Sequence, residues 1–350
     1  MTRLAILFGG KSIEHEVSLK SAVSVLNAID RTKYEVIMIG ITKEGRWLLY
    51  DGPVDMIENG EWRDYAELKA LAEPEKYNLQ ILTSMNTLKT IADVAFPIMH
   101  GPNGEDGKVQ GVIEMTGIPC VGCSVLGSAL GMEKALSKAL FRQAGLPVCD
   151  WHEYCRDEIG DDIAGVIAEV EKQLPYPVFV KPAGLGASIG VSKAADREAL
   201  KEALREAAEL ERKVLVERSI NCRELEVGII GNAVPLASAV GEVTYPGAFY
   251  DNETKMTRKA EIERIVPADI PMDLAARAKE LAIEAYKTLD LRGFARVDIF
   301  LERETGELFL NEVNSIPAFA DNGMFPQLWN AVGLAYSELI DRLVGYALEK

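Results

Sequence analysis

Two segments near the carboxyl end of the chain place acidic, basic and amide side chains at strand spacing. Residues 296–300 and 309–314 alternate polar and apolar side chains on either side of a Glu-Thr-Gly turn signal at 304–306, which predicts a β-hairpin. Residues two apart in a strand point to the same face of the sheet. The polar side chains that would then share one face are those of Arg296, Asp298, Glu312 and Asn314.

A turn centred on Thr305 would pair Asp298 with Glu312 and Arg296 with Asn314. Directly opposed side chains have Cβ atoms about 4.5–5.5 Å apart, where like charges are destabilising. A divalent cation would turn this repulsion into a binding site. Oxygen donors suit Mg²⁺, which is usually bound by one or two carboxylates and by substrate phosphates. The alternative interpretation is a solvated polar face that Arg296 balances.

A glycine-rich segment supplies the second candidate for chemistry. Residues 178–192 read as a strand with Lys181, a loop with Ser188, and a second strand, which predicts a hairpin with a mobile tip. Backbone N–H groups in such loops can cradle phosphate, although a plain surface hairpin has the same pattern. The candidate phosphate-binding cations are Lys134, Lys181, Lys255 and Arg296. With a carboxylate-bound Mg²⁺, this loop suggests ATP as a ligand.

Neither standard nucleotide-binding motif is present. Gly10-Lys11-Ser12 would need a glycine at position 5 to be a P-loop, and that residue is Ala5. In residues 184–190 the third glycine falls one place too late for a dinucleotide fingerprint, and the required helix does not follow.

Composition excludes several classes of partner. The net charge of −16 argues against non-specific binding to nucleic acid or to anionic membranes, which need basic surfaces. No apolar run approaches the roughly 20 residues that span a bilayer, and the start lacks a signal-peptide pattern. Five cysteines in 350 residues do not indicate a disulfide framework. We therefore expect a soluble, cytoplasmic protein.

The elements that must position these residues begin with a βαβ pattern. Strands are expected at 4–8 and 34–41 around a helix at 17–29, with a further strand at 93–99, and this pattern predicts an α/β first domain. A domain boundary is expected near 122, followed by one helix over 124–144. Further strands are expected at 189–192, 214–217, 224–230 and 236–243, and helices at 196–210, 271–289 and from about 327. The long polar segment 245–261 reads as a lid loop.

Taken together, the motifs resemble those of D-alanine–D-alanine ligases, and they occur in that family's order along essentially the whole chain. The matching segments are residues 9–19, 100–107, 181–190, 249–255, 296–298 and 311–317. The resemblance implies an ATP-grasp fold of the α/β (α+β) class. It implies three domains: residues 1–122, which hold the first substrate; 123–212, with the glycine-rich loop; and 213–350, with the lid and the metal site.

The resemblance also implies the reaction: ATP phosphorylates the carboxylate of one D-alanine, and the amine of a second attacks the acyl phosphate. Glu14 would hold the first ammonium, with His100 beside it. Arg296 would stabilise the tetrahedral intermediate, and Ser188 would lie above the phosphates. The implied ATP contacts are Lys134, Lys181, Lys255, Glu217 and Glu224, and those of two Mg²⁺ (or Mn²⁺) ions are Asp298, Glu312 and Asn314. The family further implies a homodimer.

The chain departs from the family where the second substrate would bind. A serine of the loop and a tyrosine of the lid, which fasten the lid through the N-terminal glutamate in typical members, are Ala187 and Met256 here. Residues 318–324 also depart from the usual pattern. Tyr250 and Met324 replace the phenylalanine and arginine of D-serine-using relatives, which disfavours D-serine.

We therefore expect a D-alanine–D-alanine ligase with a relaxed second site. Loss of the lid tyrosine is shared with relatives that use D-lactate. The alternatives are an acceptor such as D-lactate or another D-amino acid, another ATP-grasp amide ligation, and a catalytically silent ATP-binding protein.

Overall fold

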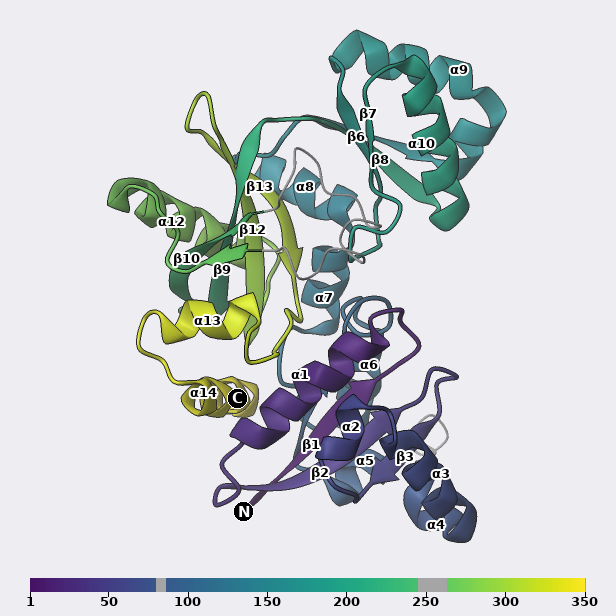
Figure 1. Ribbon diagram of the computed structural model, residues 1–350, viewed down its shortest axis with the longest axis vertical. Helices are drawn as coiled ribbons and strands as arrows, with labels where there is room; N and C mark the ends of the chain where they lie inside the picture. Colours follow the sequence, from purple (N-terminus) through teal and green to yellow (C-terminus); the bar gives the residue numbers. More distant parts are fainter. Residues whose placement is uncertain (80–85, 245–262, 350) are drawn as a thin grey trace.

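The structure, a computed structural model, describes residues 1–79, 86–244 and 263–349 and contains three β-sheets (Figure 1). The first sheet has the order β3-β2-β1-β4, and β1, β2 and β4 are parallel. Its strands are β1 (Thr2–Gly9), β2 (Tyr34–Ile41), β3 (Trp47–Tyr50) and β4 (Val94–Ile98). With α1 (His15–Ala28) after β1, the expected βαβ opening is confirmed.

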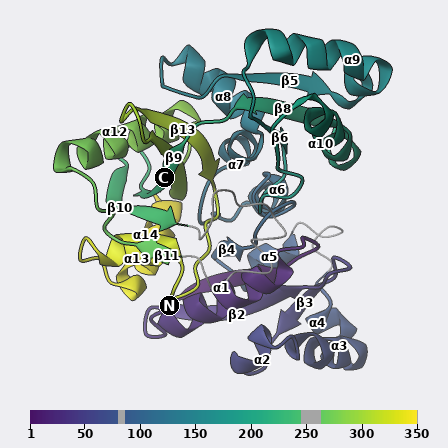
Figure 2. The ribbon, with the colours of Figure 1, turned by 45° about the horizontal axis from the view of Figure 1, so that its top comes forward.

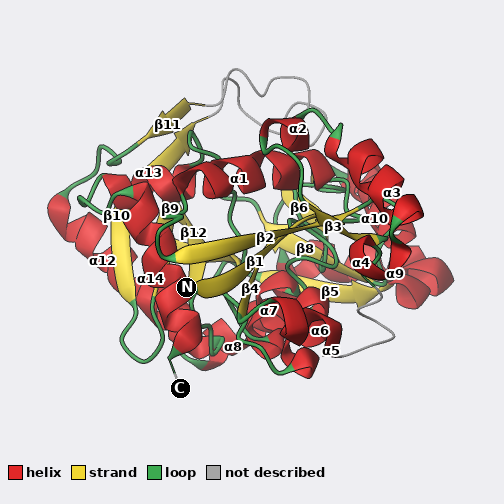
Figure 3. Ribbon diagram, turned by 90° about the horizontal axis from the view of Figure 1, so that it is seen from below, coloured by secondary structure: helices red, strands yellow, loops and turns green. Residues whose placement is uncertain are grey.

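Helices cover both faces of the first sheet because alternate residues of β1 are apolar on each side. Leu4 and Ile6 pack with α1, whereas Ala5 and Leu7 pack with α5 and α6. Figure 3 shows α1 above the sheet and the other two helices below it. The remaining helices of this part are α2 (Asp55–Glu58), α3 (Trp62–Ala72), α4 (Pro74–Tyr77), α5 (Asn86–Ile91) and α6 (Lys108–Thr116). The carboxyl ends of β1 and β4 lie side by side, so the loops that carry Glu14 and His100 meet.

The second sheet lies at the top of the molecule in Figure 2, opposite the first. Its order is β5-β8-β6-β7, with β5 (Trp151–Cys155), β6 (Val178–Pro182), β7 (Ser192–Ala194) and β8 (Lys213–Arg218). Two helices, α9 (Arg156–Gln173) and α10 (Arg197–Leu210), share its core. The expected strand at 189–192 is wrong, because Ala187, Ser188 and Gly190 have positive φ angles and the chain becomes extended only at Ser192.

The third sheet carries the predicted hairpin. Its order is β11-β10-β9-β12-β13, with β9 (Cys222–Ile230), β10 (Leu236–Thr244), β11 (Glu263–Ile265), β12 (Phe294–Glu302) and β13 (Leu308–Asn314). One face is apolar and packs against α12 (Met272–Thr288). The opposite face is partly covered by α13 (Met324–Asn330), because Gly228 and Gly241 lie directly beneath its side chains.

Two expected helices are broken. Residues 124–144 form α7 (Val125–Met132) and α8 (Lys134–Gln143), separated at Glu133, where the Lys134 N–H donates 3.0 Å to the carbonyl of Ala183 instead of continuing the helix. The last helix is likewise two, α13 and α14 (Tyr336–Leu348), separated by a turn in which Gly333 has φ +84°.

The largest core joins the two ends of the chain. Leu339 and Leu343 of α14 pack with Phe96 of β4, and Phe319 and Phe325 extend the same cluster. The division of the chain at residues 122 and 212 stays a prediction. β8, which begins just after residue 212, pairs with β5 and β6 of the second sheet. Among the described residues, no helix is both long and apolar enough to cross a membrane.

Candidate active site

The predicted hairpin forms with the predicted partners. Asp298 pairs with Glu312 and Arg296 with Asn314. The register then shifts by one residue, because Ile299 pairs with Leu310, which leaves Asn311 as the extra residue of a β-bulge. Without the bulge, Glu312 would point to the apolar face, since a shift of one residue turns every side chain over. The bulge therefore places Glu312 beside Asp298.

Arg296 and Asp298 form the centre of this face. The Nε and Nη2 atoms of Arg296 each lie 2.7 Å from a carboxylate oxygen of Asp298. The amide nitrogen of Asn314 donates to the same carboxylate at 2.9 Å, and Lys134 Nζ lies 3.3 Å from Glu312 Oε2. Burial disfavours the charge of Arg296, but Asp298 and Glu226 outweigh it and hold its pKa well above the ordinary value. Arg296 is therefore a permanent cation.

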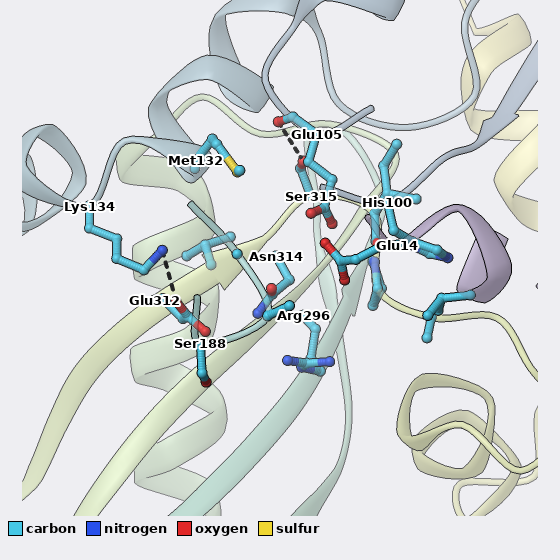
Figure 4. Close-up of a pocket in the computed structure, with 18 residues that line it drawn as sticks. Glu14, His100, Glu105, Met132, Lys134, Ser188, Arg296, Glu312, Asn314 and Ser315 are labelled. Carbon is cyan, nitrogen blue, oxygen red and sulfur yellow. Dashed lines mark hydrogen bonds and ion pairs between the residues drawn. The ribbon is translucent and has the colours of Figure 1, made fainter. Parts of the chain in front are cut away.

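Two cavities meet at this face. The larger, about 650 Å³, runs between the second and third sheets and is within the usual size range of ligand pockets. The smaller, about 190 Å³, lies towards the first sheet. Both are lined by Lys134, Gly186, Ala187, Ser188, Arg296 and Glu312. Figure 4 shows Glu14, Ser188 and Arg296 gathered around the smaller cavity from three different parts of the chain. The shared residues, Arg296 among them, form the border between the two cavities.

The larger cavity has a cationic end. Lys181 Nζ lies 2.7 Å from one oxygen of Glu217, and Lys138 Nζ lies 3.4 Å from the other. Burial lowers the pKa of Lys138, whereas the two lysines overcome the effect of burial and lower that of Glu217. The Glu217 side chain is thus occupied by two lysines, and its expected contact with ATP stays a prediction. The sequence pattern did not lead us to predict Lys138 as a site residue, although its spacing of four residues from Lys134 places both lysines on the same face of a helix.

The glycine-rich loop covers the border between the cavities. Ala187 and Ser188 have φ angles of +51° and +56°, a conformation that non-glycine residues rarely adopt. Lys134 Nζ donates to the Leu185 carbonyl at 2.8 Å and holds the base of the loop. A Cβ atom at Gly186 would lie 3.5 Å from Glu14 Oε2, so the loop reaches the first-sheet side of the site.

The smaller cavity contains two carboxyl groups. Glu14 and Glu105 both line it, and Gly101 lies between them. The Gly101 N–H donates to Glu105 Oε2 at 3.0 Å, and a Cβ atom there would approach Glu14 Oε2 to 2.5 Å. Burial and repulsion from Glu14 raise the pKa of Glu105 to about 8. Glu105 belongs to the 100–107 motif but was not singled out from the sequence.

His100 joins three parts of the chain. Its Nδ1 lies 2.9 Å from the Ile316 carbonyl, which can only accept, so Nδ1 carries the proton. Its Nε2 accepts from the Ser21 hydroxyl at 2.9 Å, and that hydroxyl oxygen accepts from the Phe319 N–H at 3.2 Å. Burial lowers the pKa of His100 to about 4. The neutral ring fixes the segment after β13 to α1 and β4, and both its nitrogens are occupied.

Other expected site residues lie elsewhere. Glu224 lines the larger cavity. Met324 is buried, packs with Val243 and Leu328, and lines neither cavity formed by the described residues, whereas Ala318 lines the smaller one. Three further candidates, all in the expected lid, lie outside the described residues: Tyr250, Lys255 and Met256.

The donor set fits a hard divalent cation. The carboxylates of Asp298 and Glu312 and the amide oxygen of Asn314 come from adjacent strands on the cavity face, and such oxygens are the ligands that Mg²⁺ prefers. On the same face, burial and repulsion from Asp298, opposed by Arg296, leave the pKa of Glu226 raised to about 8. A bound cation would reduce the repulsion among these carboxylates.

The class of protein follows from solved structures with the same fold. Over 99% of both chains, the structure matches the VanG D-Ala:D-Ser ligase from Enterococcus faecalis with a TM-score of 0.88 and 33% identity. It matches the D-alanine-D-alanine ligase from Coxiella burnetii with a TM-score of 0.81 and 30% identity, over 99% of this chain and 95% of that one. These are ATP-grasp ligases, so the expected fold is confirmed.

The family itself is shown by sequence. Residues 3–123 match the family described as D-ala D-ala ligase N-terminus, and residues 140–345 match D-ala D-ala ligase C-terminus. The chain is 45% identical to the D-alanine–D-alanine ligases of Ruminiclostridium cellulolyticum and of Thermoanaerobacter sp. strain X514, in each case over 99% of this chain and 96% of the relative. The chain belongs to the D-alanine–D-alanine ligase family, whose members are ATP-dependent carboxylate–amine ligases.

Proposed function

We propose that this protein joins two D-alanine molecules through an acyl phosphate, with ATP in the larger cavity and the first D-alanine in the smaller. The observation that carries this proposal is the meeting of the two cavities at Lys134, Ser188, Arg296 and Glu312. A carboxylate in one cavity and a phosphoryl group in the other would approach each other there. Both are anionic, so catalysis depends mainly on positioning and on charge neutralisation.

Glu14 binds the ammonium group of the first D-alanine, because its carboxylate reaches the smaller cavity, and His100 lies beside it. Lys134, Lys181 and Lys255 hold the phosphates beneath Ser188, and Glu217 and Glu224 hold the nucleoside. Asp298, Glu312 and Asn314 hold two Mg²⁺ ions, which Mn²⁺ can replace, and the bound metal supplies charge neutralisation at the phosphates. Arg296 stabilises the negative charge of the tetrahedral intermediate.

The acceptor site is more permissive than that of typical members of the family. A serine at 187 and a tyrosine at 256 would give Glu14 two hydrogen-bonding partners, and this chain has Ala187 and Met256 instead. Because the serine and the tyrosine are replaced together, neither hydroxyl group is left in the site without the other.

The test is phosphate release by the purified protein with ATP, Mg²⁺ and D-alanine, followed by mass spectrometry of the product. We expect D-alanyl-D-alanine from D-alanine alone, and additional mixed products when D-lactate or another D-amino acid is added. D-Serine is tested separately as the second substrate, because one of the solved structures above is a D-Ala:D-Ser ligase. Absence of any dipeptide from D-alanine alone would overturn the proposal.

A matched pair of variants ties the activity to the hairpin. Arg296→Lys loses the two-point contact with Asp298, and we expect kcat to fall by about 100-fold or more. Arg303→Lys, at the exposed end of the same hairpin, keeps full activity. Equal activity of both variants would remove Arg296 from the mechanism.

We further propose that the protein acts in the cytoplasm as a homodimer and supplies the dipeptide for peptidoglycan precursors. The family relationship supports this setting. Sedimentation velocity would measure the mass in solution, and a species of one chain at micromolar concentration would contradict the dimer.

A further inference from the structure

A third carboxylate lies beside the two that the hairpin supplies. Asp298 of β12 pairs with Glu312 of β13 on one side and with Glu226 of β9 on the other. The three carboxylates therefore form a row across adjacent strands, on the face that lines the larger cavity. Like charges placed opposite each other in a sheet are destabilising, so the third one calls for an explanation.

Glu226 contacts Arg296 as well. Its Oε2 atom lies 3.1 Å from Arg296 Nε, and its side chain is only 13% exposed. The same Nε lies 2.7 Å from Asp298 Oδ1. Carboxylates at two neighbouring positions of the sheet thus flank Arg296. Its single Nε–H donates to Asp298, and Glu226 Oε2, which has no hydrogen-bond partner among the described residues, lies within reach of the same Nε.

The two partners of Arg296 differ in what else they must do. In the proposed function, on which this inference rests, Asp298 is a metal ligand. A carboxylate that binds Mg²⁺ gives oxygen lone pairs to the ion and holds the guanidinium less firmly. Glu226 is not needed for the metal, so it can keep its contact with Nε throughout the reaction.

We infer that Glu226 is the positioning residue of Arg296: it fixes Nε and keeps the guanidinium aimed at the border between the two cavities while Asp298 binds metal. Glu226 acts through Arg296 and not on the substrate. A guanidinium displaced by about 1 Å from the reacting centre can lose about 100-fold in rate.

The test compares Glu226→Met, which removes the acceptor oxygen at similar length, with Glu226→Gln, which keeps an acceptor oxygen. We expect Glu226→Met to lower kcat by about 10- to 100-fold, with KM for ATP and for D-alanine changed less than about twofold. Glu226→Gln recovers most of that loss. Without ligands both variants should unfold close to the temperature of the parent, because each removes a carboxyl group whose charge burial disfavours, while Arg296 keeps its two hydrogen bonds with Asp298.

Glu242→Met is the matched control, because it removes another buried carboxylate of the same sheet. Glu242 accepts a hydrogen bond of 2.7 Å from Arg223 and lines neither of the two cavities as the described residues form them. This variant should lower the unfolding temperature and leave kcat unchanged. A direct readout is the hydrogen exchange of the Arg296 Nε–H, identified by its loss in Arg296→Lys. With Mg²⁺ and a non-hydrolysable ATP analogue bound, it should exchange faster in Glu226→Met than in the parent.

Three results would overturn the inference: an unchanged kcat in Glu226→Met, equal losses in Glu226→Met and Glu226→Gln, or a raised KM for ATP at constant kcat. The last would make Glu226 a nucleotide contact. A parent protein that forms no dipeptide would instead refute the proposed function, so the two failures are distinguishable.

Discussion

Lowering the pH should weaken the contacts by which His100 links the segment after β13 to α1 and β4. Its Nδ1 donates to the Ile316 carbonyl and its Nε2 accepts from Ser21, so a second proton on the ring would place a donor against a hydroxyl that already donates there. Burial, helped by the charge of Arg296 and opposed by the hydrogen bond to Ile316, lowers the pKa of His100 in the folded protein from 6.5 to about 4. The unfolded chain has no such constraint and takes up the proton near pH 6.5.

The sign and size of the effect follow from this difference. Because the folded pKa is lowered, the contribution of neutral His100 to stability is complete above pH 6.5 and is lost as the pH falls towards 4. Linkage between these two values gives a loss of about 2 kcal/mol at about pH 5 and about 3 kcal/mol in full.

The assay is urea unfolding of the parent and of His100→Asn at about pH 7.5 and about pH 5. The asparagine keeps a donor towards Ile316 but cannot titrate. Other groups titrate equally in both proteins, so the parent should lose about 2 kcal/mol more than the variant. His152→Asn, on β5, is the control and should behave as the parent. The chain has three histidines, so their NMR titrations can be followed individually. A His100 resonance that titrates near pH 6.5 would refute the reasoning.

Three further predictions concern buried groups of the site. Gly101→Ala forces a Cβ into left-handed backbone (φ +70°) and to 2.5 Å from Glu14 Oε2, so KM for the first D-alanine should rise at least 10-fold; an unchanged KM would contradict this. Glu217→Gln leaves two buried lysines together and should cost about 3–5 kcal/mol in urea unfolding, more than Lys138→Met, which leaves a balanced pair. The raised pKa of Glu105 means that the folded protein loses stability as the pH rises from 4.5 towards 8. Between about pH 7 and about pH 9, Glu105→Gln should therefore lose about 1 kcal/mol less than the parent in urea unfolding.

The hairpin shows which parts of the site a sequence pattern can predict. Alternation and the turn signal were enough to predict the pairs at Asp298 and Arg296, because a strand repeats every two residues. The bulge at Asn311 was not predictable, since nothing local marks an extra residue. The predicted partners were right for the end of the hairpin that matters to the site, although the register differs near the turn.

Residues whose roles depend on distant strands were missed. Glu226 has meaning only once β9 is known to pair with β12, and Lys138 reads as an ordinary helix lysine until β8 brings Glu217 to it. Met324 was placed near the acceptor from its position in the motif, whereas helix packing turns its side chain into a small core with Val243. In each case the tertiary neighbour determines the role.

The packing of α14 into the first core has a consequence for synthesis. During translation β1, α1 and β4 leave the ribosome first, but the apolar surface that Leu339, Leu343 and Phe319 cover stays open until nearly the whole chain has been made. The nascent first domain therefore waits with part of its core exposed, a state in which chains are prone to aggregate. Its final closure and the docking of the segment after β13 are one event, so the amino-acid site is completed only when the last helix arrives.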